Sequence, residues 1–303
     1  MKQLHNFGHK YVWIENPRVR KLRYGITAIN NFQFIDFETA TWQLIERSDV
    51  GYMANLLTRF FPFNSKAMPS VHARREGLWR GLCLGDKNGG PTQMAMRLKE
   101  SLEELGRFCP QDIFSRYYKW WCREGFDTGP TVEGVFQLVR SGLPRTDAVK
   151  VIYDESNMEA AGCNPAHRSA PLAMMDFLQI DEIDCLARQE ARLTHLHPDS
   201  AETAAAVVLL CRYLINGLAW DEALNATAAK VIGPARLALI NANSGALSRG
   251  GDAPEVLRTA IAFVSTQVDF NSALQASLVF AGPANYSPVL VGCIAGARWG
   301  ASE

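Results

Sequence analysis

Apolar residues recur at helical spacing from about residue 74 to the C-terminus, and this pattern constrains the fold more than any other feature. The clearest helix lies in "HPDSAETAAAVVLLCRYLING", where Ser200 or Asp199 would cap the start and Gly217 would follow the end. Its expected buried stripe comprises Ala204, Val207, Val208, Cys211 and Leu214. Other helices are expected at 92–107, after Pro110, and at about 219–231, 254–268, 270–281 and 287–299. The pattern predicts an all-α domain, and its many Ala and Gly residues would allow close helix packing.

Residues 1–73 have a different pattern. The stretch "KLRYGITAINNFQFIDFETATWQLI" contains alternation and β-branched residues, and "YMANLLTRFF" then has a helical pattern. Pro62 and Pro69 bracket an expected linker. We therefore divide the chain into an N-terminal extension of mixed structure, residues 1–73, and a helical domain, residues 74–303. The extension would serve as a lid or a docking arm.

Charge and cysteine content narrow the class of protein. Lys and Arg total 31, as do Asp and Glu, so the net charge indicates neither a nucleic acid nor a membrane as partner. Residues 1–75 nevertheless carry a net charge of +6, and could dock on the acidic remainder or meet an acidic ligand or protein partner. Seven scattered cysteines without a CxxC pair, no secretory signal and no long apolar run predict a cytoplasmic protein.

Several polar clusters at helix ends could carry chemistry. In "EGFDTGPTVEGVF", Asp127, Gly129 and Thr131 form a turn before a helix, where backbone N–H groups can receive a phosphate or a ribose hydroxyl. The simpler alternative is that Asp127 or Thr131 caps the helix. In "AAGCNPAHRSAPLAM", the 162–168 loop could bring backbone amides and Arg168 to a phosphate, or could be a surface turn with an incidental histidine.

Two further pairs give weaker signals. His195 and His197 in "LTHLHPDS" would suggest a metal site, but no third ligand lies at the usual spacing, so a structural turn before the helix is favoured. Cys163 and His167 could form a thiol nucleophile and its base, although no orienting acid lies near them in sequence.

Taken in order, these clusters resemble the motifs of the ADP-ribosylglycohydrolase family, hydrolases that remove ADP-ribose from its acceptor. The resemblance spans about residues 74–303 and implies a compact all-α orthogonal helix bundle. The segments are similar to family motifs as follows: "GLCLGDKNGGP" to the turn GDALGAP, "TQMAM" to the end of TDDTQMAL, "YYKWWCREGFDTGPT" to W…G…D-x-G-N-T, "GCNPAHRSAPL" to G-N/C-G-x-A-M-R-x-A-P-L, "LTHLHP" to TH-x-HP, and "GPANYSPVLVGCIAGARWG" to GD-x-DT followed by AGAxYG.

The departures from the family fall on its metal ligands. The family binds two Mg²⁺ ions through TDDT and GD-x-DT, and hard cations need such clustered oxygen ligands. The corresponding positions here hold no carboxylate; they are Gly89, Gly90, Pro91, Pro283, Asn285 and Tyr286. We therefore expect no metal and no other cofactor.

What remains of the family pattern favours recognition of a small ADP-ribosyl-like ligand. One hypothesis is an enzyme that acts without Mg²⁺ on an ADP-ribosyl, nucleotide-like or other small N-glycosidic substrate. Its expected catalytic residues are Asp127, Asp86, His167 and Tyr286. Its expected ligand-binding residues are Thr131, Gly162, Cys163, Asn164, Arg168, His195 and Asn285. The alternative is a catalytically inactive pseudoenzyme that binds such a ligand, or a partner protein through residues 1–73.

Overall fold

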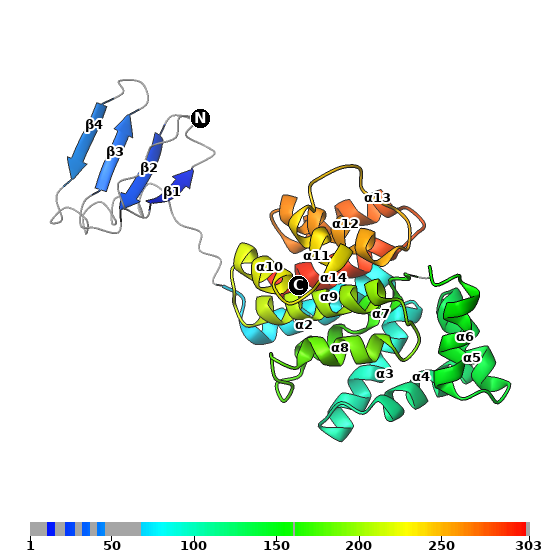
Figure 1. Ribbon diagram of the computed structural model, residues 1–303. Coiled ribbons are helices and arrows are strands. Elements are labelled where there is room, and N and C mark those ends of the chain that lie inside the picture. The colour runs from blue at the N-terminus through cyan, green and yellow to red at the C-terminus, as the bar shows by residue number, and fades with distance from the viewer. Residues whose placement is uncertain are drawn as a thin grey trace. The chain divides into compact units, whose positions relative to one another are not determined.

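The computed structural model describes residues 68–159 and 161–300 in full, and the backbone of four strands between residues 11 and 45. By internal contacts the chain divides into two compact units, residues 1–67 and 68–303. In the first unit, β1 (Tyr11–Glu15), β2 (Leu22–Thr27), β3 (Phe32–Asp36) and β4 (Thr41–Ile45) form an antiparallel sheet in chain order (Figure 1). Strands β2, β3 and β4 lie in the stretch where the sequence shows alternation and β-branched residues, whereas the helical pattern at "YMANLLTRFF" lies outside the described residues.

The second unit is all-α among its described residues, as the helical periodicity predicted. Its helices, in chain order, are α2 (Val71–Asp86), α3 (Gly90–Leu105), α4 (Pro110–Glu124), α5 (Pro130–Arg140), α6 (Arg145–Glu155), α7 (Asn164–Arg168), the 3₁₀ helix η2 (Ala170–Met174), α8 (Ile183–Ala191), α9 (Pro198–Ile215), α10 (Trp220–Ala228), α11 (Gly233–Ile240), α12 (Ala253–Thr266), α13 (Phe270–Ala281) and α14 (Tyr286–Trp299).

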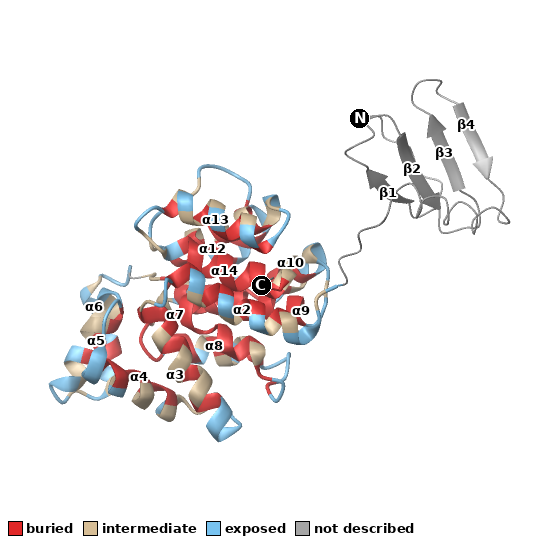
Figure 2. Ribbon diagram, turned by 180° about the vertical axis from the view of Figure 1, so that it is seen from behind, coloured by how far each residue is buried: buried red, intermediate tan, exposed pale blue. Residues whose placement is uncertain are grey.

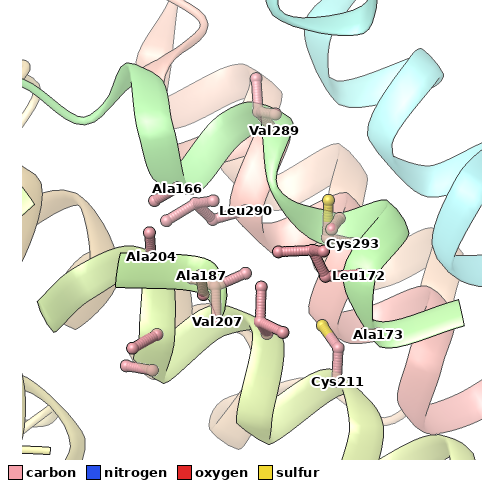
Figure 3. Close-up of a cluster of buried hydrophobic side chains, with 14 of the residues drawn as sticks. Ala166, Leu172, Ala173, Ala187, Ala204, Val207, Cys211, Val289, Leu290 and Cys293 are labelled. Atoms are coloured by element: carbon pink, nitrogen blue, oxygen red, sulfur yellow. The ribbon is translucent and has the colours of Figure 1, made fainter. Parts of the chain in front are cut away.

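Helix α9 lies at the centre of this unit, with α8, α10, α11, α12, α14, α7 and η2 packed around it (Figure 2). Nearly every residue from Ser200 to Ile215 is buried, so the expected one-sided stripe extends around the whole helix. Small residues make this possible, because Ala side chains let neighbouring helices approach on all sides. Figure 3 shows part of the resulting core, where α7, η2, α8, α9 and α14 contribute Ala166, Leu172, Ala187, Val207 and Leu290.

The ends of α9 differ in how well the sequence predicted them. Gly217 follows the helix with a φ of +90°, the left-handed conformation expected of it. The expected cap was wrong. His197 is the N-cap, and its Nδ1 accepts a hydrogen bond from the Asp199 amide at 3.2 Å. The Ser200 hydroxyl instead donates to the Gly162 carbonyl at 2.9 Å, so it ties the 162–168 segment to the central helix.

Helices α2 and α14 pack together through backbone rather than side chains. A Cβ atom added to Gly292 would lie 2.0 Å from the Gly81 carbonyl oxygen, and one added to Gly296 would lie 2.0 Å from the Gly77 carbonyl oxygen. No side chain fits at either position. This crossing brings Asp86, the last residue of α2, to Asn285, which precedes α14: Nδ2 of Asn285 donates to Oδ1 of Asp86 at 2.8 Å.

Candidate functional site

A cavity of about 270 Å³ opens where several helices begin. Its wall contains the first residues of α3, α5 and α14 and the segment that leads into α7. His195, which precedes α9, and Gly251, which precedes α12, complete the wall. Its lining comprises Pro91, Asp127, Thr128, Gly129, Pro130, Thr131, Gly162, Cys163, Asn164, His167, His195, Gly251, Asn285 and Tyr286. Because helix N-termini carry partial positive charge and unpaired N–H groups, this wall suits an anionic or oxygen-rich ligand.

The turn before α5 holds an exposed carboxylate at the cavity. Asp127 has a φ of +51° and Gly129 a φ of +76°, and both left-handed residues are needed to turn the chain sharply into Pro130. The simpler interpretation, in which Asp127 or Thr131 caps the helix, is wrong. Gly129 is the N-cap residue, and no side-chain hydrogen bond caps the helix. Oδ2 of Asp127 instead accepts a hydrogen bond from the Gly90 amide at 3.4 Å.

A second carboxyl, Asp86, lies beside Asp127. A Cβ added to Gly89 would lie 2.6 Å from Oδ2 of Asp127 and 3.1 Å from Oδ1 of Asp86, so both carboxyls approach the same glycine. Asp86 is 2 % exposed, and its Oδ2 accepts from the Thr92 amide and hydroxyl at 2.8 and 2.7 Å. Burial raises the pKa of Asp86 to about 6; the hydrogen bonds from Thr92 oppose this shift, and the charge of Asp127 adds to it.

The α7 wall is held by a fully buried ion pair. Nε of Arg168 donates to Oε1 of Glu190 at 2.7 Å, and both side chains are 0 % exposed. The guanidinium also donates to Oδ1 of Asn164 at 2.6 Å and to Oγ1 of Thr194 at 2.8 Å. Asn164 then donates to the Thr128 carbonyl at 3.1 Å. The pair therefore links the α7 wall to the turn before α5.

Two buried histidines line the same cavity. His195 lies against Gly162, whose added Cβ would be 3.1 Å from Nε2, and its Nδ1 lies 2.9 Å from the Thr194 hydroxyl. Burial and the nearby Arg168 charge lower the pKa of His195 to about 3. Burial also lowers the pKa of His167 to about 4, although the Tyr286 backbone opposes this shift. Both rings are therefore neutral at pH 7.

Cys163 is the thiol of this wall, and its surroundings do not favour a nucleophile. Its Sγ lies 4.0 Å from Nδ1 of His167, but burial raises the pKa of the thiol to about 12. Nε2 of His167 is buried without a hydrogen-bond partner. The interpretation of this segment as a surface turn with an incidental histidine is wrong, because residues 165–168 are buried.

Tyr286 forms an exposed part of the wall. Its side chain is 40 % exposed, and its ring lies 3.1 Å from the position of a Cβ on Gly251. Gly251 is held in place because its carbonyl accepts from the Cys163 amide at 3.1 Å. A phenol is therefore available at the edge of the cavity, as both a hydrogen-bond donor and an aromatic face.

The structure brings most of the expected site residues together. Nine line the cavity: Asp127, Thr131, Gly162, Cys163, Asn164, His167, His195, Asn285 and Tyr286. Asp86 and Arg168 lie behind the lining, where Asp86 contacts Asn285 and Arg168 contacts Asn164. The sequence analysis missed Thr128, Gly251, Thr194 and Glu190. Thr194 adjoins His195 within "LTHLHP", a signal that could have identified it, whereas nothing in the α8 pattern distinguishes Glu190 from a surface acid.

Within residues 68–159 and 161–300, no three His, Cys, Asp or Glu side chains are gathered in a way that could hold a metal ion. None of the helices in these ranges is long and apolar enough to cross a membrane.

Comparison with known proteins assigns the family. Among solved structures, an ADP-ribosylglycohydrolase-related protein complex is similar, with a TM-score of 0.62 and 23 % identity over 77 % of this chain and 89 % of that chain. This likeness confirms the fold. No curated protein sequence matches. The family model for ADP-ribosylglycohydrolase matches residues 90–303, which is more than half of the sequence. The chain therefore belongs to the ADP-ribosylglycohydrolase family.

Proposed function

We propose that the protein acts, without the usual Mg²⁺ ions, on an ADP-ribosyl, nucleotide-like or other small N-glycosidic ligand bound in the cavity. The observation that carries this proposal is the pair of carboxyls at Gly89. Asp127 faces the cavity, and Asp86 lies beside it with its pKa raised to about 6. A carboxyl whose pKa is raised towards neutrality can exchange a proton near neutral pH, beside a second carboxyl that faces the ligand.

The shape and polarity of the cavity support this ligand class. A volume of about 270 Å³ is close to the lower end of ligand sites, which suits a ribosyl group with its attached groups reaching outward. The first turns of α3, α5 and α14 border the cavity and favour phosphate oxygens. Thr131 and Asn285 offer a hydroxyl and an amide for sugar hydroxyls.

The donor atoms at the family's metal positions do not fit a pair of Mg²⁺ ions. Asn285 directs its NH₂ group to Asp86, so this end of the amide donates hydrogen bonds and cannot ligate a cation. Both oxygens of Asp86 already accept hydrogen bonds from Thr92 or Asn285. Asp127 alone then offers a carboxylate to the cavity, whereas each Mg²⁺ needs near-octahedral oxygen coordination. We therefore derive no step through a metal.

The proposed reaction is hydrolysis of a glycosidic bond. The Asp127 carboxylate takes a proton from a water molecule, whose oxygen forms the new bond to the anomeric carbon. The bond from that carbon to the acceptor nitrogen or oxygen breaks, and its electron pair leaves with the acceptor. The acceptor takes up the proton that Asp127 removed from water, which regenerates the carboxylate. Tyr286 is placed to donate a hydrogen bond to the departing group, and His167 assists as a neutral ring.

The test is turnover of an ADP-ribosylated peptide in the presence of a chelator. Asp127→Asn should reduce the rate by at least about 100-fold, the size of effect expected for a general acid or base. Asp154→Asn is the control, because Asp154 is an exposed carboxylate on α6 and does not line the cavity. Equal rates for the wild-type and Asp127→Asn proteins would contradict the role of Asp127.

The second candidate is a protein that binds the same ligand without cleaving it. The burial of Asp86 favours this function, because a carboxyl that is 2 % exposed and fully hydrogen-bonded is poorly placed to reach a substrate. Binding of ADP-ribose without turnover of any ADP-ribosylated peptide would support this candidate over the enzyme.

We also propose that residues 1–73 act as a lid or as a docking arm for a partner protein. The net charge of +6 on residues 1–75 supports an acidic surface as the target. Comparing the full chain with a chain lacking residues 1–67 tests this, since deletion should release a partner or change ligand affinity. A deletion that changes neither would contradict both roles.

A further inference from the structure

A buried chain of hydrogen bonds runs from α8 to the cavity. It begins at Glu190, whose Oε1 accepts two hydrogen bonds: one from the Tyr117 hydroxyl at 2.8 Å and one from Nε of Arg168 at 2.7 Å. A terminal nitrogen of Arg168 donates to Oγ1 of Thr194 at 2.8 Å, and this hydroxyl lies 2.9 Å from Nδ1 of His195. Each of these groups is at most 3 % exposed, so water does not compete for their protons.

The direction of the protons along this chain follows from the chemistry of each group. A guanidinium can only donate, so the Thr194 oxygen is an acceptor towards Arg168. The Thr194 hydrogen must then go to another acceptor, and Nδ1 of His195 lies within reach. If Nδ1 carried the proton instead, the Thr194 hydrogen would be buried without a partner, which costs about 1–3 kcal/mol.

The charge of His195 is settled by the same surroundings. An imidazolium would place a second buried positive charge next to Arg168, and burial itself disfavours the charged ring. A neutral ring whose Nδ1 accepts a hydrogen bond carries its one proton on Nε2. Nε2 lies at Gly162, and both Gly162 and His195 line the cavity.

From this geometry we infer that Glu190, Arg168 and Thr194 fix His195 as a neutral imidazole protonated on Nε2, which binds an acceptor oxygen of the ligand. The acceptor atom of the ligand is a phosphate oxygen, a carbonyl oxygen or a hydroxyl oxygen. A cationic group or a group that only donates is excluded, because a neutral Nε2–H offers it no acceptor. The ligand half of this inference rests on the proposed function, whereas the tautomer half does not.

Thr194 and Arg168 act as positioning residues in this scheme. Neither lines the cavity, and each acts through a residue that does. Arg168 also positions Asn164, because another N–H group of the same guanidinium donates a hydrogen bond to Oδ1 of Asn164. The identity of the ligand atom at His195 is therefore set by residues that no ligand would touch.

Thr194→Val and Thr194→Ser form a matched pair of variants. Valine has nearly the shape of threonine but lacks the hydroxyl, so the hydrogen bond to Nδ1 disappears and the His195 tautomer is no longer fixed. Serine keeps the hydroxyl and should restore wild-type behaviour. ADP-ribose should bind about 3- to 10-fold more weakly to Thr194→Val, in line with one lost hydrogen bond, and with wild-type affinity to Thr194→Ser.

The direct test is ¹⁵N NMR of the full chain labelled at histidine, without ligand, at pH 7. Comparison with His195→Gln assigns the His195 signals. We expect a pyrrole-type nitrogen at Nε2 and a pyridine-type nitrogen at Nδ1 in the wild type and in Thr194→Ser, and a mixture of tautomers in Thr194→Val. A proton on Nδ1, a doubly protonated ring, or an unchanged tautomer in Thr194→Val would overturn the inference.

The same samples separate this inference from the proposed function. If the wild-type ring has the expected tautomer but ADP-ribose does not bind, the proposed function and the ligand half fail while the positioning by Thr194 stands. If ADP-ribose binds and the tautomer is the opposite one, the proposed function stands and the inference fails.

Discussion

The two sides of the cavity are held by opposite means. On one side, the crossing of α2 and α14 depends on glycines, which have no side chain. Gly81 and Gly292 allow the two backbones to touch, and this contact places Asp86 against Asn285. On the other side, the wall of α7 depends on charge, since the buried Arg168–Glu190 pair holds Asn164 and, through Thr194, His195.

This difference decides how each side can fail. A close backbone contact tolerates no added carbon atom, although the backbone groups that form it do not titrate. A buried ion pair tolerates changes of volume better, but loss of one partner leaves an uncompensated charge. The predictions below test each side in turn, beginning with the change that should cost most.

Loss of the buried charge should have the largest effect. Arg168→Met leaves Glu190 unpaired in the core and should lower the free energy of unfolding by about 3–5 kcal/mol. Urea denaturation measures this loss. The double variant Arg168→Met/Glu190→Gln removes both charges and should recover most of the stability, while ADP-ribose binding stays weak because Asn164 and His195 have lost their anchor. A double variant that binds as well as the wild type would contradict the role of the pair.

An added methyl group at the helix crossing should cost somewhat less. Gly292→Ala places a Cβ 2.0 Å from the Gly81 carbonyl oxygen, so α2 and α14 must separate, at a cost of about 3 kcal/mol. Gly250→Ala is the control, since its Cβ would meet Ser248 at an ordinary 3.5 Å. Thermal unfolding of both variants measures the difference. Equal melting temperatures would show that the crossing is not close-packed.

The buried carboxyl on the crossing side should make stability depend on pH. The pKa of folded Asp86 is about 6, above its ordinary value, so its protonated form stabilises the fold. This stability is present below about pH 4 and lost as the pH rises through about 6, a change on the order of 3 kcal/mol. Asp86→Asn cannot ionise, so the stability of the wild type relative to this variant should fall over that range. Asp127→Asn should move the fall to lower pH, whereas a flat difference would refute the raised pKa.

The smallest effect is expected where the two carboxyls meet. Gly89 has a φ of −70°, which alanine adopts without strain. The Cβ of Gly89→Ala would lie 2.6 Å from Oδ2 of Asp127, and 3.1 Å from both Oδ1 and the backbone oxygen of Asp86, so the variant mainly displaces the Asp127 side chain. It should cost about 1 kcal/mol of stability. Turnover should fall more than stability, because Asp127 loses its position. A variant that loses stability but keeps full turnover would show that the pairing of the carboxyls is structural.

The helix crossing was predicted only in general terms. The density of Ala and Gly indicated close helix packing, but the glycines at 77, 81, 292 and 296 that form the crossing of α2 and α14 were not identified from the sequence. The helices were placed within a few residues in most cases, for example 270–281 for α13. Helices α6, α8 and α11 were not expected individually. In α11, Leu237 and Ile240 are exposed and do not follow the spacing of a buried face.

The candidate site was predictable only as far as its motifs reached. The ordered motifs identified nine of the residues that line the cavity, because each motif lies at a helix end that faces it. The motifs did not indicate that Arg168 lies behind the cavity lining. From the sequence alone, an arginine in a loop could bind either a phosphate or a buried carboxylate. Glu190 could not be identified, because its burial depends on tertiary contacts such as those with Tyr117 of α4 and Arg168 of α7.

The measurement that tests the central claim most directly is calorimetric titration of ADP-ribose into the full chain, once with a chelator and once with excess Mg²⁺. Because the donor atoms at Asp86, Asn285 and Tyr286 do not fit a pair of Mg²⁺ ions, we expect the same affinity under both conditions. Asn164→Leu, which removes both of that residue's polar bonds, should weaken binding equally in each. Binding that occurs only with Mg²⁺ would contradict the account.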